Sequence, residues 1–173
     1  MSTKFEAVKN KVIAQEQLLA TIKTWKATNQ KIVFTNGVFD LLHRGHIEYL
    51  AQTAGFADKL IVAVNADASV KRLGKGDSRP LQDENSRALI IAALEFVDAV
   101  VIFDSDTPFE IISTIKPDVL IKGGDYDANC TDTSDQKYIV GSDIVNQNGG
   151  EVNVIQFVEG YSTTQIEEKI KNS

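Results

Sequence analysis

Apolar runs that are typical of buried strands alternate along this chain with segments of helical periodicity. The five strand candidates are rich in Val, Ile and Phe and lie at residues 31–35, 59–65, 99–103, 118–122 and 151–156. Several are almost continuously apolar, as expected of strands covered on both faces. Helical patterns lie between them, and an amphipathic helix containing a core residue, Trp25, is expected at residues 12–28. The alternation predicts a doubly wound, five-stranded parallel sheet of Rossmann-like α/β architecture.

A single domain accounts for residues 1–173, because typical domains contain roughly 100–200 residues and no linker or internal repeat divides the chain. The polar segment 127–137 is interpreted as a surface insertion with weak order. Two helix starts are recognisable. The sequence Thr107-Pro108-Phe109-Glu110 predicts a capping box with proline at the first helical position, and Ser162 followed by Gln165 predicts the start of the last helix.

Composition excludes several kinds of partner. A net charge of -6 argues against a protein that binds the backbone of nucleic acids. No apolar stretch approaches the ~18 residues that span a membrane, and the polar N-terminus lacks the core of a signal peptide. The single cysteine, Cys130, excludes an intrachain disulfide and is typical of the reducing cytoplasm, where we expect the protein to reside.

Both histidines of the chain, His43 and His46, lie in one segment between the first strand candidate and a helical pattern. Imidazole donors and a helix N-terminus together favour binding of a phosphate chain. Gly45 lies between the histidines and lets the backbone approach a phosphate closely. The pair Asn36-Gly37 is predicted to form a turn whose N–H groups face an anion. This segment is therefore the first candidate for a binding site.

Further polar residues follow the other strand candidates, where doubly wound sheets bind their ligands. Asn65 follows the second strand, and Lys122-Gly123-Gly124-Asp125 follows the fourth. Lys122 ends an apolar strand, and an ammonium group is costly there without an anionic partner, so we expect it to contact a phosphate. The helix start at Ser162-Thr163-Thr164 offers hydroxyls and free N–H groups to phosphates, although an ordinary N-cap explains Ser162 equally well.

Residues 71–80 form a glycine-rich loop that is interpreted either as a clamp over phosphates or as a solvated loop. Its four cations are Lys71, Arg72, Lys75 and Arg79. Arg87, on the following helix, faces either the same site or solvent. Asp40 is interpreted as a residue that orients a histidine, helps to hold Mg²⁺, contacts substrate or stabilises a turn. Phe39 is better suited to packing than to stacking on a ligand.

These motifs resemble those of a known superfamily. His43-Arg44-Gly45-His46 after a strand resembles the motif of the HxGH nucleotidyltransferases, which transfer a nucleotidyl group from a nucleoside triphosphate to a phosphate or similar acceptor. Gly160-Tyr161-Ser162-Thr163-Thr164 is similar to the Gly-x-Ser-Thr-Thr helix start of its cytidylyltransferase-like members. Residues 76–80 (Gly-Asp-Ser-Arg-Pro) and 122–126 (Lys-Gly-Gly-Asp-Tyr) resemble the adenylyltransferase domain of bacterial ADP-heptose synthases in particular.

The resemblance implies transfer of AMP from ATP to D-glycero-β-D-manno-heptose 1-phosphate, giving ADP-heptose for the lipopolysaccharide inner core and pyrophosphate. It implies catalytic roles for His43, His46 and Lys122. Nucleotide or phosphate contacts are expected from Thr35, Asn36, Gly37, Phe39, Gly45, Gly123, Ser162, Thr163 and Thr164. Acceptor contacts are expected among Asp40, Asn65, Lys71, Lys75, Arg79, Arg87 and Asp125.

The resemblance also implies partners and a cofactor. Mg²⁺ would be held mainly by the phosphates of the nucleotide, and no metal ligand from the protein is predicted. A homodimer is expected, and the N-terminal helix could serve it. Many members fuse this domain to a sugar kinase, so the sugar 1-phosphate is expected to come here from a separate kinase.

Two alternatives remain open at this point. CTP with glycerol 3-phosphate or another sugar phosphate would use the same chemistry, because base choice depends on backbone contacts. A non-catalytic nucleotide-binding module is disfavoured by the intact set of site residues. A class I aminoacyl-tRNA synthetase would need a far longer chain and an RNA-binding surface, and a dehydrogenase would need a Gly-x-Gly-x-x-Gly sequence after the first strand.

Overall fold

Five parallel strands form one twisted sheet in the part of the chain that the computed structural model describes, residues 3–74 and 79–172. The strand order is β3-β2-β1-β4-β5, so the chain winds outward from β1 in both directions. The strands are β1 (Ile32–Gly37), β2 (Lys59–Asn65), β3 (Ala99–Phe103), β4 (Val119–Gly123) and β5 (Glu151–Ile155). Each begins and ends within two residues of its predicted position. The predicted doubly wound sheet is therefore confirmed.

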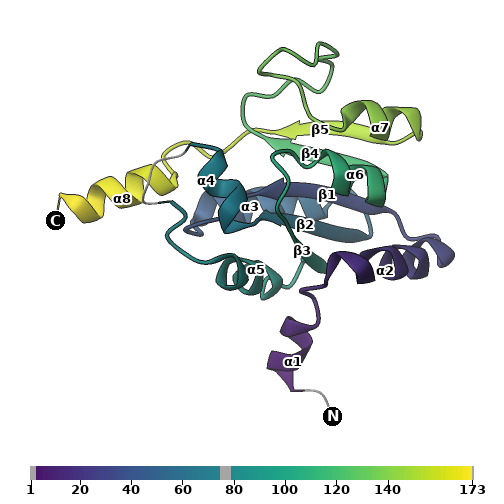
Figure 1. Ribbon diagram of the computed structural model, residues 1–173, viewed down its shortest axis with the longest axis horizontal. Helices are drawn as coiled ribbons and strands as arrows, with labels where there is room; N and C mark the ends of the chain where they lie inside the picture. Colours follow the sequence, from purple (N-terminus) through teal and green to yellow (C-terminus); the bar gives the residue numbers. More distant parts are fainter. Residues whose placement is uncertain (1–2, 75–78, 173) are drawn as a thin grey trace.

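Helices cover both faces of this sheet (Figure 1). Their bounds are α1 (Lys4–Lys9), α2 (Gln15–Ala27), α3 (Arg44–Ala54), α4 (Asp67–Arg72), α5 (Glu84–Ala92), α6 (Phe109–Ile115), α7 (Ser142–Gln147) and α8 (Thr163–Lys171). Side chains of α2, α6 and α7 join one apolar core, and those of α3 and α5 join the other. Successive residues of β1, such as Val33 and Phe34, point into opposite cores and are fully buried. These two cores hold the strand ends in fixed positions.

The N-terminal region differs from its predicted form. The helix expected at residues 12–28 begins only at Gln15, and a separate helix, α1, precedes it. Between them the backbone is extended, with Val12 bridging to Val100 in parallel, so the segment covers the outer edge of β3. Trp25 packs against the core formed with α2, as predicted.

The start of α6 also differs from its prediction. Pro108 is the N-cap residue rather than the first helical residue, and no side chain caps this helix. Ser105 instead donates to Glu110 from outside the helix. None of the helices among the described residues is long and apolar enough to cross a membrane.

Candidate functional site

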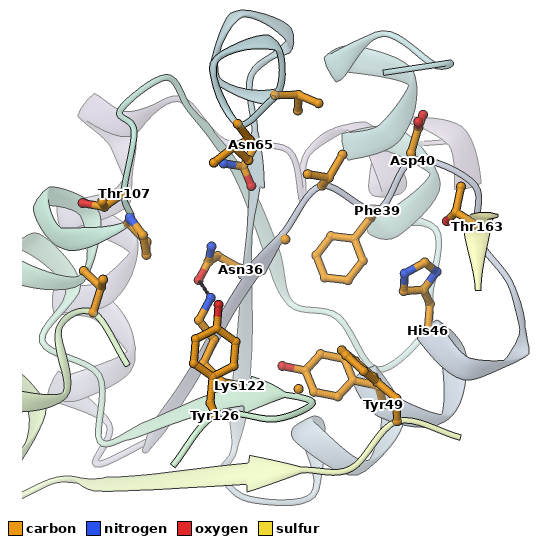
Figure 2. Close-up of a pocket in the computed structure, with 18 of the residues that line it drawn as sticks. Asn36, Phe39, Asp40, His46, Tyr49, Asn65, Thr107, Lys122, Tyr126 and Thr163 are labelled. Atoms are coloured by element: carbon orange, nitrogen blue, oxygen red, sulfur yellow. Dashed lines mark hydrogen bonds between the residues drawn. The ribbon is translucent and has the colours of Figure 1, made fainter. Parts of the chain in front are cut away.

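A cleft of 910 Å³ opens at the carboxyl ends of the strands (Figure 2). Its walls come from the loops after β1, β2, β3 and β4 and from the first turn of α8. The lining residues that the argument uses are Asn36, Gly37, Phe39, Asp40, His46, Tyr49, Asn65, Arg79, Lys122, Gly123, Tyr126, Phe157, Thr163 and Thr164. Residues from distant parts of the sequence thus meet at the edge where this fold binds ligands.

The loop after β1 leads to the histidine motif, residues 43–46, at the cleft. The turn predicted at Asn36-Gly37 is wrong, because both residues still pair with β2 as the last residues of β1. The chain turns instead at Phe39, which has a left-handed backbone with φ of 50°. A Cβ on Gly37 would lie 3.0 Å from the Phe39 ring, so glycine leaves room for that ring. Phe39 is buried, as its packing role requires.

The two histidines lie against each other at the start of α3. Their ring centroids are 3.9 Å apart with an angle of 24° between the planes, and the Phe39 ring packs in a T-shaped arrangement against His46, with 5.5 Å between the ring centroids. His46 lines the cleft, whereas His43 is the N-cap residue of α3 behind it. The Nδ1 atoms of both rings are buried with no hydrogen-bond partner among the described residues.

The environment of this pair keeps both rings neutral. Burial, and then the neighbouring charge of His43, lowers the pKa of His46 to about 4, although a hydrogen bond that the ring donates to the Leu41 backbone opposes the shift. Burial also lowers the pKa of His43. Desolvation disfavours the imidazolium form, and an anion brought near the rings would favour it. The pair is therefore set to gain positive character when a phosphate binds.

Lys122 reaches across the sheet from β4 to β1. Its Nζ donates to Oδ1 of Asn36 at 2.7 Å, and the ammonium lies 5.5 Å from the centre of the Tyr126 ring. The amide oxygen and the aromatic face both contact the ammonium group at the carboxyl end of β4. Lys122 also lines the cleft, and the phosphate contact expected of it stays a prediction.

The floor of the cleft contains aromatic residues that sequence reasoning missed. Tyr49 of α3 lies with its hydroxyl 2.6 Å from that of Thr35, and it donates to the carbonyl of Ile121, so it ties β1 to β4. Phe157 packs edge-on to Tyr49 at 5.7 Å. A Cβ on Gly123 would lie 2.3 Å from the Phe157 ring, which explains why glycine stands there. Thr35 itself is fully buried below the cleft.

The helix start predicted at Ser162 is present. The Ser162 hydroxyl accepts a hydrogen bond from the Gln165 backbone N–H, so it acts as the N-cap. Thr163 and Thr164 line the cleft, whereas Ser162 does not. Figure 2 shows Thr163 on the same side of the cleft as His46. Gly45 does not line the cleft, and a Cβ on it would lie 3.1 Å from the His43 ring.

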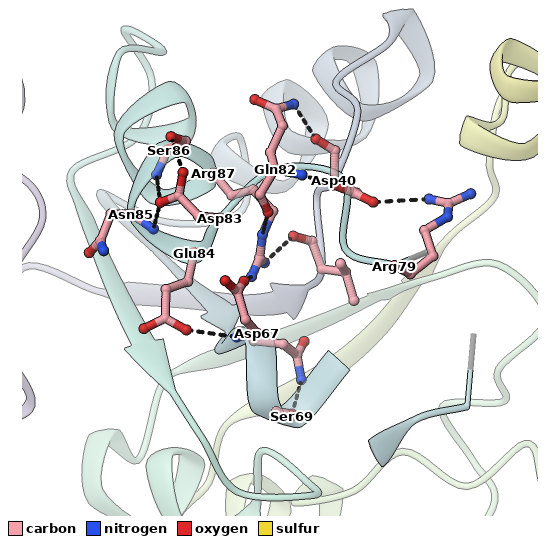
Figure 3. Close-up of polar contacts among 12 residues, drawn as sticks. Asp40, Asp67, Ser69, Arg79, Gln82, Asp83, Glu84, Asn85, Ser86 and Arg87 are labelled. Atoms are coloured by element: carbon pink, nitrogen blue, oxygen red, sulfur yellow. Dashed lines mark hydrogen bonds and ion pairs between the residues drawn. The ribbon is translucent and has the colours of Figure 1, made fainter. Parts of the chain in front are cut away.

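Asp40 is held by the segment that precedes α5 (Figure 3). Its carboxylate accepts from the backbone N–H of Leu81 at 2.9 Å and of Gln82 at 3.0 Å, and from the Arg79 guanidinium at 3.2 Å. The residue is only 4 % exposed. Asp40 therefore fixes the motif loop, and its carboxylate is already engaged, which does not suit the predicted acceptor contact.

Arg87 has a structural position rather than one in the cleft. Its guanidinium is fully buried and donates to the carbonyls of Val38 at 2.7 Å and Gln82 at 2.9 Å, and to the Asp67 carboxylate at 2.6 Å. Figure 3 shows this network beneath the motif loop. Arg87 thus supports the residue before Phe39, and the acceptor contact predicted for it does not agree with this burial.

Only some of the remaining residues predicted to contact the acceptor line the cleft. Asn65 lines the cleft and donates to Ser69, and Arg79 lines it as well. Residues 71 and 72 belong to α4 and not to the predicted loop. Lys71 is exposed there and does not line the cleft. Asp125 lines a neighbouring depression, which shares Tyr126 with the cleft. Lys75 lies outside the described residues.

Two loops supply lining residues that the sequence analysis did not select. The loop after β3 contributes residues 106–108. The segment 127–137 is closed by a hydrogen bond that the Asp127 backbone N–H donates to the Lys137 carbonyl, and it is followed by Tyr138, which lines the cleft. Gln136, near the end of this segment, also lines the cleft. The rule that ligands bind where strands end could have identified the first loop. Nothing in the composition of the second indicated that it returns to the cleft.

Protein ligands for a metal are not grouped in the described residues: none of their His, Cys, Asp and Glu side chains form a cluster of three or more that could hold an ion. Two carboxylates line the cleft, and each is paired with an arginine: Asp106 with Arg72 and Asp40 with Arg79. The arrangement therefore suits an anionic ligand that approaches histidine, lysine and helix N–H donors.

Curated relatives match most of this chain. The protein named "Bifunctional protein HldE" from Campylobacter jejuni is 51 % identical over 162 residues, which cover 94 % of this chain and 32 % of the relative. The protein of the same name from Wolinella succinogenes is 45 % identical over 163 residues, with the same coverage of 94 % and 32 %. The chain thus spans about a third of the length of these relatives.

Solved structures share the fold. A lipopolysaccharide core biosynthesis protein from Thermoplasma volcanium is 30 % identical with a TM-score of 0.57, and the match covers 77 % of this chain and 99 % of that one. A pantoate-beta-alanine ligase from Francisella tularensis is 15 % identical, with a TM-score of 0.59 and coverage of 92 % and 76 %, and shows the likeness of fold alone. The family model described as cytidylyltransferase-like matches residues 34–169. With His46, Lys122 and the threonines of α8 around one cleft, the chain belongs to the cytidylyltransferase-like family and is a nucleotidyltransferase.

Proposed function

We propose that this chain transfers AMP from ATP to D-glycero-β-D-manno-heptose 1-phosphate and releases pyrophosphate. The observation that carries the proposal is a single cleft onto which His46, Lys122 and Thr163 all face. The heptose acceptor is supported by the Lys-Gly-Gly-Asp-Tyr sequence at residues 122–126 and by the 51 % identity with HldE of Campylobacter jejuni.

The reaction is an in-line displacement at phosphorus. A phosphate oxygen of the acceptor attacks the α-phosphorus of ATP and forms the new P–O bond. The bond from the α-phosphorus to the oxygen bridging it to the β-phosphate breaks, and its electron pair leaves with pyrophosphate. Negative charge grows on the α-phosphate oxygens and on the leaving bridge, so donors already in place at these atoms lower the barrier.

His46 is proposed to donate to the α-phosphate, with His43 stacked behind it. Both rings are neutral in the free protein because burial lowers their pKa values. The triphosphate would favour their protonated form by bringing negative charge close to them. Lys122, held against Asn36, would counter the charge where the acceptor phosphate meets the nucleotide. Thr163, Thr164 and the N–H groups of α8 would bind the β- and γ-phosphates.

Mg²⁺ is proposed to enter the cleft with the triphosphate. It prefers to keep several waters and to bind substrate phosphates, which fits a cleft whose described residues offer no cluster of carboxylates. When bound, it would neutralise charge on the phosphates of the nucleotide. No side chain of the protein is assigned to it.

Pyrophosphate release in the presence of Mg²⁺ tests the proposal. ATP, CTP, GTP and UTP are each combined with the heptose 1-phosphate or with glycerol 3-phosphate, and the His46→Ala variant controls for contaminating activity. We expect release only with ATP and the heptose phosphate. Release with CTP and glycerol 3-phosphate would keep the chemistry and overturn the substrates. Nucleotide binding without release in any combination would contradict catalysis with these acceptors.

A further inference from the structure

Helix α8 contributes to the cleft without being part of either core. None of its described residues is buried, and Ile170 is 68 % exposed. The helix projects away from the sheet at the C-terminal end of the fold (Figure 1). Its first turn nevertheless presents Thr163 and Thr164 to the cleft. Apolar packing alone therefore does not explain the position of this wall.

Two arginines connect α8 and the residues before it to the histidine motif. Arg79 lies with Nε 2.9 Å from Oε1 of Glu167, while its Nη1 lies 3.2 Å from Oδ2 of Asp40. Arg44, the first residue of α3, donates to the hydroxyl of Tyr161 at 3.4 Å. The Arg44 contact is exposed, whereas the Arg79 side chain is only 15 % exposed and that of Glu167 is 17 % exposed. The contact through Arg79 is therefore the better shielded from solvent.

We propose that Glu167 is a positioning residue, which acts through Arg79 and Asp40 to hold the first turn of α8 at a fixed distance from His46. This inference rests on the proposed function, because it takes the triphosphate to lie between His46 and the threonines of α8. Neither Glu167 nor Arg79 needs to touch the reacting atoms in this role.

Asp40, at the opposite end of these contacts from Glu167, is firmly held. Asp40 is nearly buried and is held by two backbone N–H groups as well as by Arg79. Oε1 of Glu167 accepts no hydrogen bond among the described residues, so its contact with Arg79 is a close ion pair. Both side chains are largely shielded from solvent, which strengthens their attraction and limits how far the helix can shift. Without this pair, binding of the triphosphate would also have to order the helix, and that cost lowers affinity.

The Glu167→Gln variant tests this role against Glu168→Gln. Glu168 is the next residue on the same helix, is exposed, and loses the same charge on substitution. We expect Glu167→Gln to raise the Michaelis constant for ATP and its dissociation constant about tenfold, with kcat and the Michaelis constant for the acceptor nearly unchanged. Glu168→Gln should leave all of these values as in the wild type.

The direction of the change separates positioning from simple electrostatics. Removal of a negative charge near the cleft would by itself strengthen the binding of an anionic nucleotide. Weaker binding in Glu167→Gln therefore supports positioning, and unchanged or stronger binding would overturn it. If another nucleoside triphosphate proves to be the substrate, the same comparison is made with that nucleotide.

Amide hydrogen exchange provides a readout that needs no substrate. In the unliganded protein, α8 amides should exchange faster in Glu167→Gln than in Glu168→Gln, while those of α5 stay unchanged. Equal exchange in the two variants would refute the tether even if the enzyme is fully active. Faster exchange in a protein that transfers no nucleotide at all would show that the proposed function has failed while the tether exists.

Discussion

Helices α3 and α8 both begin at the cleft, but they are attached to the protein in different ways. Four residues of α3 are buried, including Tyr49 and Leu50, and its side chains pack into the core shared with α5. Helix α8 buries none of its described residues and is held by polar contacts, chiefly those of Arg79. One wall of the cleft is thus set by packing and the other by a few polar contacts.

This difference suggests a division of tasks between the two walls. A donor that stabilises a transition state must be fixed in advance, because its reorganisation would raise the barrier. His46 is on the rigid helix and fits that requirement. A group that binds the β- and γ-phosphates can stabilise the ground state and the transition state equally. The helix that carries it can therefore be attached less firmly. Substitutions on the two helices should therefore affect different quantities.

The largest expected effect is on stability. Leu50→Ala removes a fully buried side chain of α3 and should lower the free energy of unfolding by about 2–5 kcal/mol. Ile170→Ala on α8 removes a side chain that is 68 % exposed and should change it by no more than about 0.5 kcal/mol. Urea unfolding of both variants measures the contrast. Similar losses would show that α8 is as much a part of the fold as α3.

Turnover should depend next on the histidine of α3. His46→Ala is expected to lower kcat about 100- to 1,000-fold with little change in the Michaelis constant for ATP, because it removes a donor to the transition state. Circular dichroism checks that the fold remains, and Gln52→Ala, an exposed change on the same helix, is the matched control. Normal turnover in His46→Ala would exclude the histidine from the chemistry.

A smaller effect should appear in the pH dependence of stability. The unfolded chain binds a proton at His46 near pH 6.5, and the folded protein binds it only near pH 4. The unfolded state holds more protons between these values, so the free energy of unfolding falls as the pH is lowered through this window. We expect His46 to account for about 1–3 kcal/mol of the loss. His46→Gln should therefore lose less stability between pH 7 and pH 4.5 in urea unfolding, and an equal loss would contradict the lowered pKa.

The smallest effect is expected on α8. Thr163→Val keeps the shape of the side chain but removes its hydroxyl, and it should raise the Michaelis constant for ATP about fivefold with kcat nearly unchanged. Steady-state kinetics with saturating acceptor measures both values. A fall in kcat as large as that of His46→Ala would end the distinction between the two walls.

Much of the fold could be predicted from sequence because strands leave a local signal. Each of the five apolar runs is a strand close to its predicted bounds, and polar residues at the strand ends, such as Asn65 and Lys122, lie at one edge of the sheet. Parallel strands with short connections allow little else. The N-terminal region was predicted less well, because the pairing of Val12 with Val100 depends on residues far apart in the chain.

The site was predictable where a residue acts through its own loop and less so where it acts through a distant partner. The roles of Asp40 and Arg87 depend on backbone groups some 40 to 50 residues away, and periodicity carries no information about such contacts. Tyr49 and Phe157 resemble ordinary core residues in sequence. Only their packing over Gly123 shows that they form the floor of the cleft.

Trp25 gives the molecule a useful optical property. It is the only tryptophan of the chain, and it packs with the core on the α2 side of the sheet rather than at the cleft. Its fluorescence should therefore change when the domain unfolds and stay nearly constant when a nucleotide binds. Emission from this one indole can follow folding separately from ligand occupancy, so the intact wild-type protein carries its own spectroscopic probe of stability.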